Sequence, residues 1–422
     1  MNLEVLTIGT ELLLGFTIDT NGAHIARTLG EIGVRVVRRS SVSDRGDDIR
    51  DAVREALART GAVITTGGLG PTHDDITKRV VADLYGAQLE FQEDIWQALV
   101  ERFARMGRVA PITNRLQAEV PRGATVLPNQ WGTAPGLWLE DPRGIVIMLP
   151  GVPREMRKLL QHEVAPRLVA RAGGRVIRSR MIRTSGIPES LLAERLGDIE
   201  ERVAPLSLAY LPGYDGVDLR LTAWDATAID ADLALDAGAG LVRERAGDHV
   251  YGEGETDLAA VLLDAARAGG VRIAVAESCT GGLVGKRLTD TPGSSDVFAG
   301  GVIAYDDEVK VRLLDVPPEL LKRHGAVSGE VASAMALGAA ARLGVPLGIG
   351  VTGIAGPGGG SEAKPVGTVC LATALGGTAE ATRVLLPGSR AEIRLRAAQA
   401  SLLLALRRLR RAARPGTGGP MK

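Results

Sequence analysis

A serine at the end of an apolar run is the first feature of the sequence that suggests chemistry. Ala274–Gly282 reads AVAESCTGG, an apolar segment that leads into a glycine-containing turn, and Ser278 stands at the junction. This pattern predicts a strand, a turn and a helix, so that unpaired N–H groups of the first helical turn would hold an oxyanion or a phosphate. The residues expected to do so are Thr280, Gly281 and Gly282. The alternative role for Ser278 is a helix N-cap.

A serine nucleophile needs a base, and Lys310 is the candidate. We predict a strand over Gly301–Tyr305 and a helix over Asp306–Leu314, which places the lysine near the positive end of the helix dipole. That position and partial burial disfavour an ammonium, so we expect a neutral amine. Tyr305 would relay a proton or donate to the oxyanion, or alternatively cap the sheet as a half-buried ring. His324 lies in a polar turn, so a Ser-His-Asp triad is not favoured.

A glycine-rich loop is the third candidate element. Val351–Ser361 reads VTGIAGPGGGS, a predicted strand that opens into a loop with five glycines. Successive N–H groups in such a loop can hold a phosphate, and the alternative is a merely flexible connection. All three elements lie at the carboxyl ends of predicted strands, where open α/β sheets bind ligands. The binding residues expected here are Thr352, Gly353, Gly356, Gly358 and Gly359.

A second glycine-rich turn lies near the N-terminus. Thr65–Thr77 reads TTGGLGPTHDDIT, which follows a predicted strand and precedes a predicted helix, as phosphate-binding turns do. It is neither GxGxxG nor a Walker A loop. Ile8–Glu11 and Leu149–Pro153 lie at other strand ends of the same predicted sheet. The residues expected to bind a ligand are Gly9, Thr10, Glu11, Gly67, Gly68, Gly70, Pro150 and Gly151.

Carboxylates near this turn suggest a metal ion. Asp44, Asp74 and Asp75 would hold a divalent ion such as magnesium, which would bridge to a diphosphate, because hard cations prefer oxygen ligands. The alternative for Asp74 and Asp75 is capping of the following helix. His73 is expected to be a loop residue rather than a ligand.

The elements that position these residues follow from composition and periodicity. With 422 residues, the chain is expected to form two to four domains. Hydrophobic residues make up 45% and aromatic residues 3%, so the cores must be built from Ala, Val, Leu and Ile, as in parallel α/β sheets. Lysine plus arginine and aspartate plus glutamate both total 50, so no global field attracts nucleic acid or a membrane. Two cysteines and the absence of a signal or an 18-residue apolar run predict a cytoplasmic protein.

Short apolar runs alternate with helix-period segments in the first part of the chain, which predicts a doubly wound parallel sheet. A change of pattern over 175–254 predicts a small α+β domain, followed by a linker at Gly252–Thr256 and a second α/β domain. The strands expected are Leu3–Ile8, Val34–Val37, Ala62–Thr66, Gly144–Leu149, Arg178–Thr184, Val217–Trp224, Ile273–Ala276, Gly348–Thr352 and Thr368–Thr373. The longer helices expected are Asp94–Arg105, Arg154–Ala170, Glu189–Ile199, Val331–Leu343 and Glu392–Leu409.

The C-terminal motifs carry a resemblance to a known family. AESCTGG, GGVIAYDDEVK and VTGIAGPGG together closely resemble the C-terminal domain of the CinA family, the PncC type of nicotinamide mononucleotide deamidase, over 257–410. The resemblance implies hydrolysis of the carboxamide of nicotinamide mononucleotide to nicotinate mononucleotide and ammonia. It implies Ser278, Tyr305 and Lys310 as the catalytic set, and no cofactor for this step.

The N-terminal motifs resemble the same family. TTGGLGPTHDD with LPGVP is similar to the molybdopterin-binding fold of the MoaB and MogA type found at the N-terminus of CinA proteins. The resemblance implies a metal-dependent ADP-ribose pyrophosphatase that gives AMP and ribose 5-phosphate. The alternative is a module that only binds a molybdopterin-like ligand or a partner protein.

The resemblance also implies a domain layout and an oligomeric state. It predicts a MoaB/MogA-like domain over 1–172, a KH-like connecting domain over 173–254, an amidohydrolase domain over 255–410 and a frayed tail over 411–422. No GxxG clamp is identified in the middle domain, so we expect a spacer or a dimer contact rather than RNA binding. A homodimer is expected, with the two nucleotides as small-molecule partners and no membrane.

Overall fold

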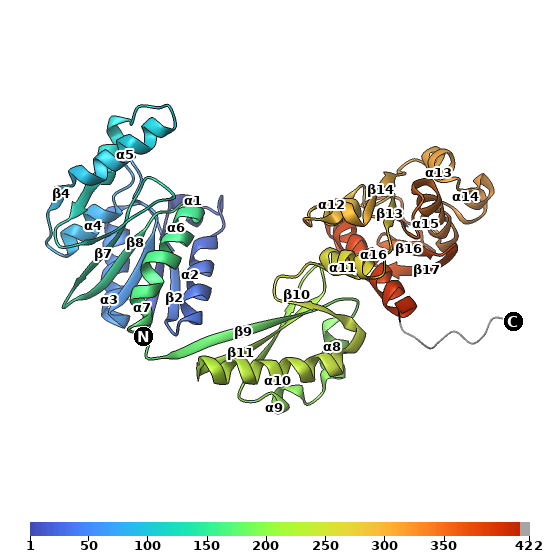
Figure 1. Cartoon of the computed structure of the whole chain (residues 1–422), viewed down its shortest axis with the longest axis horizontal. Coiled ribbons are helices and arrows are strands. Elements are labelled where there is room, and N and C mark those ends of the chain that lie inside the picture. The colour runs from blue at the N-terminus through green and yellow to red at the C-terminus, as the bar shows by residue number, and fades with distance from the viewer. Residues whose placement is uncertain (414–422) are drawn as a thin grey trace. The chain divides into compact units, whose positions relative to one another are not determined.

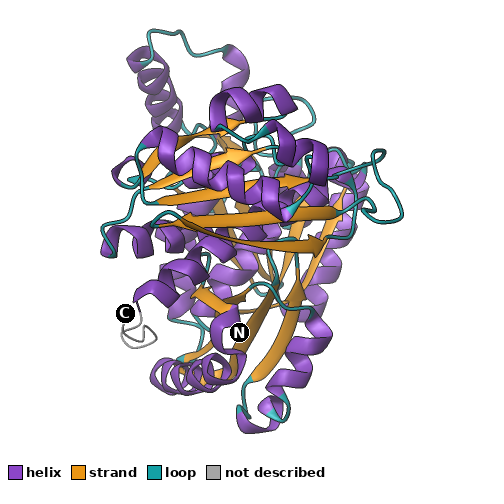
Figure 2. Ribbon diagram, turned by 90° about the vertical axis from the view of Figure 1, so that its right-hand side faces the viewer, coloured by secondary structure: helices purple, strands orange, loops and turns teal. Residues whose placement is uncertain are grey.

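The computed structural model describes residues Met1–Ala413 (Figure 1). The described residues form two compact units, the first made of Met1–Arg178 with Ala223–Ala234 and the second of Ser179–Thr222 with residues 235–413. Helices flank β-sheets in both units, as Figure 2 shows by colour. The predicted α/β class with a small middle domain is confirmed.

The first unit contains a six-stranded sheet in the order β2-β1-β3-β8-β7-β6. The first four strands are parallel, and β7 and β6 are antiparallel additions. Helices α2 and α6 share one apolar core with the sheet, and α3 and α4 share another, so both faces are covered. The strands are β1 (Asn2–Ile8), β2 (Arg35–Val42), β3 (Ala62–Thr66), β6 (Thr125–Leu127), β7 (Gly136–Asp141) and β8 (Gly144–Leu149), and the helices are α1 (Thr10–Leu13), α2 (Thr20–Glu31), α3 (Gly46–Thr60), α4 (Thr77–Leu84), α5 (Glu93–Arg105), α6 (Pro153–Leu159) and α7 (Ala165–Val169). A separate pair, β4 (Leu89–Phe91) and β5 (Glu119–Pro121), is antiparallel.

The predicted helix over Arg154–Ala170 is interrupted. A π-helical segment, Leu160–Val164, separates α6 from α7, and Pro166 stands at the start of α7. Proline has no N–H to donate to the preceding turn, which accounts for the altered hydrogen-bond spacing.

The middle of the chain forms a four-stranded sheet in the order β10-β11-β9-β12. Its strands are β9 (Arg175–Thr184), β10 (Ser207–Pro212), β11 (Val217–Thr227) and β12 (Val250–Glu253), and its helices are α8 (Glu189–Leu196), α9 (Ile199–Arg202) and α10 (Ala228–Ala246). The linker predicted at Gly252–Thr256 therefore begins inside an edge strand that pairs with β9. Gly213–Gly216 does spell GxxG, contrary to the expectation, but it forms the turn between β10 and β11 rather than a connection between helices.

The last domain contains a five-stranded sheet in the order β14-β13-β15-β16-β17. The first three strands are parallel, and β16 and β17 are antiparallel. Helices α11, α12 and α16 pack on one face, while α13 and α15 pack on the other. The strands are β13 (Ile273–Glu277), β14 (Phe298–Ile303), β15 (Leu347–Gly353), β16 (Thr368–Leu375) and β17 (Thr378–Leu385), and the helices are α11 (Leu258–Ala268), α12 (Leu283–Thr289), α13 (Asp307–Leu314), α14 (Pro318–His324), α15 (Gly329–Leu343) and α16 (Arg390–Ala413).

The predicted tail over 411–422 is only partly described. Helix α16 continues to Ala413, so the first three residues of that segment are helical, and residues 414–422 lie outside the described residues. Across Met1–Ala413, the helices include none with the length and apolar character needed to cross a membrane.

Candidate functional site

Ser278 lies where three parallel strands of the C-terminal sheet end. Glu277 pairs with Ile303 of β14 and with Val351 of β15. The backbone N of Ser278 donates to Val351 O at 2.9 Å, and the residue as a whole is only 7% exposed. Helix α12 begins five residues later with Gly282 as its cap, so the alternative of Ser278 as a helix N-cap is wrong.

The helix that follows Ser278 does not present free N–H groups, because a buried carboxylate occupies them. Glu277 is 1% exposed and accepts hydrogen bonds from the backbone N of Gly282 at 2.8 Å, Val284 at 3.1 Å and Gly285 at 2.8 Å. The backbone N of Gly281 donates to Ser278 O at 3.0 Å. The prediction that Gly281 and Gly282 hold an anion through their N–H groups is therefore wrong.

Cys279 and Thr280, which follow Ser278 in this turn, differ from it in their chemistry. Burial raises the pKa of the Cys279 thiol to about 12, so the thiol stays protonated at neutral pH and Ser278 is the better nucleophile candidate. Thr280 is fully buried, and its Oγ1 has no hydrogen-bond partner among the described residues. A buried hydroxyl without a partner is costly, which marks Thr280 as a residue that a ligand could satisfy.

Lys310 projects from α13 toward the edge where β14 ends. It is 1% exposed, and its Nζ donates to Tyr305 O at 3.2 Å and to Asp307 Oδ1 at 2.8 Å. The backbone N of Ala304 donates to Glu277 O at 2.7 Å, so the Tyr305–Lys310 segment starts beside the strand that ends at Ser278. The amine is ion-paired with Asp307 rather than isolated, and Ser278 Oγ is not among its partners within Met1–Ala413.

Tyr305 lies beyond the end of β14, which stops at Ile303. The residue is 62% exposed, so the alternative of a half-buried ring that caps the sheet is wrong. Its hydroxyl accepts a hydrogen bond from Arg390 Nη2 at 3.0 Å, and Arg390 Nη1 donates to Gly356 O at 2.7 Å. Arg390 thus joins the tyrosine to the glycine-rich loop.

Sequence reasoning missed Arg390 and also Arg394. Arg394 donates to Cys279 O at 3.1 Å through Nε and to Thr280 O at 2.8 Å through Nη2. Both arginines lie in the first turns of α16, where the helix dipole disfavours a cation. Two arginines four residues apart at a predicted helix N-terminus were the available signal, because such a placement indicates a task other than helix stabilisation.

The glycine-rich loop is anchored at its base and open at its tip. Thr352 is 1% exposed, and its Oγ1 donates to Ala326 O at 2.9 Å, so the hydroxyl is already occupied. A Cβ on Gly353 would lie 2.9 Å from Thr368 O, which requires glycine. Gly358 has open space around it, and Gly356 and Gly359 have positive φ. The tip is therefore the part of the loop that a ligand can approach.

In the N-terminal domain, the ends of four parallel strands bring the predicted segments together. Gly9 N donates to Val42 O at 3.0 Å, and Thr10 N donates to Asp44 Oδ2 at 2.9 Å. Gly67 N donates to Leu149 O at 3.0 Å, which joins the TTGGLGP turn to the LPGVP segment.

Asn21, which sequence reasoning missed, joins the end of β3 to the segment after β8 by hydrogen bonds. Its Nδ2 donates to Thr66 Oγ1 at 3.1 Å and to Gly151 O at 2.7 Å, while Thr66 Oγ1 donates to Pro150 O at 3.0 Å. The Oδ1 of Asn21 is buried with no hydrogen-bond partner in the described chain.

The glycines of the N-terminal turn are required by close packing. Gly67 and Gly68 have positive φ, and a Cβ on Gly67 would lie 2.3 Å from Ile8 O. Thr77 Oγ1 donates to Gly67 O at 3.0 Å. The turn is thus held against the first strand and the start of α4, as expected from its sequence.

The three aspartates do not form a metal site. Asp75 accepts from Thr72 N at 2.9 Å, and hydrogen bonding from Thr72 lowers the pKa of Asp74. Helix α4 begins at Thr77 with no side-chain cap, so the capping alternative for Asp74 and Asp75 is also wrong. Over residues 1–413, no group of three or more His, Cys, Asp or Glu side chains could hold a metal ion. The expected cluster of Asp44 with Asp74 and Asp75 is absent, so the residues present do not fit a protein-built metal cage.

Comparisons with known proteins cover most of the chain. Residues 4–170 match the family described as "Probable molybdopterin binding domain", 179–252 the "Damage-inducible protein CinA KH domain" and 255–409 the "CinA C-terminal domain". A CinA-like protein of Gemmatimonas aurantiaca is 55% identical over 416 residues, which is 98% of this chain and 96% of that protein. A CinA-like protein of Dictyoglomus thermophilum is 40% identical over 396 residues, 94% of this chain and 96% of that protein. The solved structure of CinA from Thermoplasma acidophilum is 39% identical, with a TM-score of 0.35, and the match covers 38% of this chain and 94% of that chain.

Proposed function

We propose, because the chain belongs to the CinA family, that its C-terminal domain hydrolyses the carboxamide of nicotinamide mononucleotide to nicotinate mononucleotide and ammonia. The observation that carries the proposal is the buried hydroxyl of Ser278 at the end of β13, next to the strand end that leads into Tyr305 and Lys310. The raised pKa of Cys279 supports the serine over the neighbouring thiol.

The reaction proceeds in two steps. Ser278 Oγ attacks the amide carbon while its proton passes to Lys310, which for this step must leave its pair with Asp307 and carry a neutral amine. The collapsing intermediate releases ammonia, which takes that proton. Water then hydrolyses the acyl-enzyme ester and regenerates the serine hydroxyl. The Tyr305 hydroxyl, which Arg390 holds, donates to the developing oxyanion. Arg390 also donates to Gly356 O of the glycine-rich loop, and in this proposal the ribose phosphate of the nucleotide binds at the tip of that loop.

Ammonia release from nicotinamide mononucleotide tests this function. Ser278→Ala removes the nucleophile, so we expect the rate to fall by at least about a thousandfold with the fold intact. The matched control is Ser295→Ala, at an exposed serine between α12 and β14, which should keep full activity. Full activity in Ser278→Ala would exclude the mechanism, and no ammonia from the unmodified protein would exclude the function. Lys310→Ala, assayed in the same way, tests the proposed base separately from the nucleophile, and ammonia release should fall in this variant as well.

A second activity is proposed for the N-terminal domain, namely cleavage of ADP-ribose to AMP and ribose 5-phosphate. The observation that favours a ligand here is Asn21, which bonds to the end of β3 and to the segment after β8, and whose Oδ1 is buried and unpaired among the described residues. Over residues 1–413 no group of three or more acidic, histidine or cysteine side chains could hold a metal ion, so in this proposal the diphosphate of the substrate would supply part of the ligands of a divalent ion.

AMP release from ADP-ribose, measured with and without magnesium, tests this activity. Asn21→Ala should abolish it, whereas full activity in Asp74→Ala with Asp75→Ala would separate those carboxylates from the reaction. Titration with a molybdopterin nucleotide decides the alternative that the domain only binds a ligand. A homodimer in solution also stays a proposal, which sedimentation equilibrium tests.

A further inference from the structure

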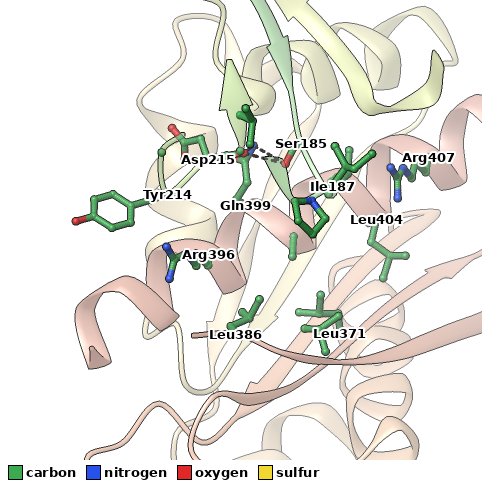
Figure 3. A pocket seen from close by; sticks show the side chains of 18 of the residues that line it. Ser185, Ile187, Tyr214, Asp215, Leu371, Leu386, Arg396, Gln399, Leu404 and Arg407 are labelled. Atoms are coloured by element: carbon green, nitrogen blue, oxygen red, sulfur yellow. Dashed lines mark hydrogen bonds between the residues drawn. The ribbon is translucent and has the colours of Figure 1, made fainter. Parts of the chain in front are cut away.

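A cavity of about 520 Å³ lies in the second unit, apart from the site around Ser278. One wall is formed by residues 185–188 after β9 and by 213–217 of the β10–β11 hairpin, and the other by α16 and the β16–β17 strands. Figure 3 shows Leu371 and Leu386 on the opposite side of the cavity from Ser185. Apolar side chains dominate this lining, and the volume falls in the range typical of small-molecule sites.

Helix α16 supplies the arginines and the glutamine of the cavity lining from one face. Arg396, Gln399, Leu403 and Arg407 are spaced three, four and four residues apart, and all line it. Gln399 is already satisfied, because its Nε2 donates to Ser185 Oγ at 3.1 Å and to Asp215 O at 2.8 Å. This amide joins the two walls, so it is not free to bind a ligand.

Arg407 is the polar group of the cavity that lacks its partners. Its Nε is buried with no hydrogen-bond partner in the described part of the chain. Its Nη2 lies 3.2 Å from His249 Nδ1, but that nitrogen also lies 3.2 Å from Ser185 O. Burial lowers the pKa of His249, so the ring is neutral and carries a single proton. If that proton is on Nδ1 and bonds Ser185 O, the same nitrogen cannot accept from Arg407.

The charges around the cavity leave an excess of positive charge. Asp215 lies 3.8 Å from Arg183 and 3.7 Å from Arg287, so its carboxylate is paired with arginines other than Arg407. Asp248 attracts the Arg407 guanidinium from a longer distance, while Arg410 and Arg411 repel it. No carboxylate within Met1–Ala413 forms a close ion pair with Arg407. A guanidinium that is half removed from water and not paired favours an anionic partner.

We propose that this cavity binds a small organic anion whose carboxylate pairs with Arg407 and whose aromatic or branched apolar body lies against Leu371, Leu386 and Leu404. A carboxylate matches the planar fork of a guanidinium, which can donate two parallel hydrogen bonds. Gly186 packs closely against this face of α16, because a Cβ there would lie 2.6 Å from Leu403 Cδ2 and 3.4 Å from Arg407 Nη2. The site does not depend on the proposed deamidase activity.

Calorimetric titration of the full chain tests the site with three probes, namely 2-naphthoate, 2-naphthamide and inorganic phosphate. We expect 2-naphthoate to bind about tenfold more tightly than the neutral amide, which lacks the charge, and than phosphate, which lacks the apolar body. Arg407→Gln should weaken 2-naphthoate by about tenfold and leave 2-naphthamide unchanged. The control, Lys286→Gln, removes an exposed cation of α12 that pairs with Asp290 and does not line the cavity, and it should change neither.

A second variant keeps the test decisive if Arg407→Gln does not fold. Ala400→Leu adds volume inside the cavity and should weaken both naphthalene probes. Equal affinity for 2-naphthoate and 2-naphthamide overturns the proposal. Competition of 2-naphthoate by nicotinamide mononucleotide, with no effect of Ala400→Leu, would place the anion at the Ser278 site and overturn it as well.

Discussion

Lys78 is a buried amine of the N-terminal domain whose protonation opposes folding. It is 5% exposed, its Nζ donates to Leu116 O, and burial lowers its pKa to about 8. Between pH 8 and its ordinary pKa of 10.5, the unfolded chain binds more protons than the folded chain, so the free energy of unfolding rises with pH there. Below pH 8 the cost is fully present, at most about 3 kcal/mol.

Lys78→Met should therefore stabilise the domain at pH 7, and its advantage over the unmodified chain should shrink as pH rises from 8 to 10.5. Urea unfolding at pH 7 and at pH 10 measures this difference. Lys158→Met, at an exposed lysine of α6, is the control and should have little effect at either pH. A stability difference that does not change with pH would contradict the assignment.

Cys279 should be unreactive in the folded protein. With a pKa raised to about 12, its thiolate fraction at pH 8 is on the order of one in ten thousand. We expect iodoacetamide to leave Cys279 unmodified in the native chain at pH 8 and to alkylate it after unfolding in urea, as mass spectrometry would record. Cys279→Ala should keep ammonia release. Rapid alkylation of the native protein would show an activated thiol instead.

The residues of the site were predictable to the extent that local pattern positions them. Ser278 and the Tyr305–Lys310 segment were found because each follows an apolar strand, and strand ends meet at one edge of a parallel sheet. Arg390 and Asn21 were missed because their role comes from contacts with segments far away in sequence. No periodicity within a single segment reports such contacts.

At the level of elements, Glu277 caps α12 from inside the preceding strand. Glu277→Gln removes the negative charge that three backbone N–H groups share, so we expect the C-terminal domain to lose about 1–3 kcal/mol of stability. Urea unfolding followed by circular dichroism measures the loss. Glu362→Gln, at an exposed loop position, should cost almost nothing. Equal stability of the two variants would mean that the capping carboxylate contributes little.

The elements that sequence reasoning missed or shortened have no readable apolar face. Strand β17 is an edge strand with most of its residues exposed, and β2 extends past the predicted Val37 through exposed polar residues at the other sheet's edge. Helix α10 buries Ala231, Leu235, Ala239, Val242 and Ala246 at helical spacing, but Ile229 and Leu233 are apolar and exposed, so the pattern does not single out the buried face. Central strands such as β3 and β8 were predicted with their observed bounds, because burial on both faces makes them continuously apolar.

At the level of the whole molecule, the two proposed catalytic sites, around Ser278 and around Asn21, belong to different compact units and share no residue. Sites without shared contacts act independently, so single changes should affect one activity each. We expect Ser278→Ala to leave AMP release from ADP-ribose unchanged, and Asn21→Ala to leave ammonia release unchanged, when both assays use the same preparation. A loss of both activities in either variant would show coupling between the units.

The internal carboxylate of Glu277 has a consequence for how the phosphate group of a nucleotide is recognised. Since it occupies the N-terminal amides of α12, the helix cannot serve as a fixed dipolar anion receptor, and side-chain cations such as Arg390 must supply the attraction. Attraction between point charges at a solvent-accessible rim is screened by counterions, with a Debye length of about 10 Å in 0.1 M salt. Nucleotide affinity should therefore decline with ionic strength, whereas a nucleoside without the phosphate should bind weakly at every salt concentration.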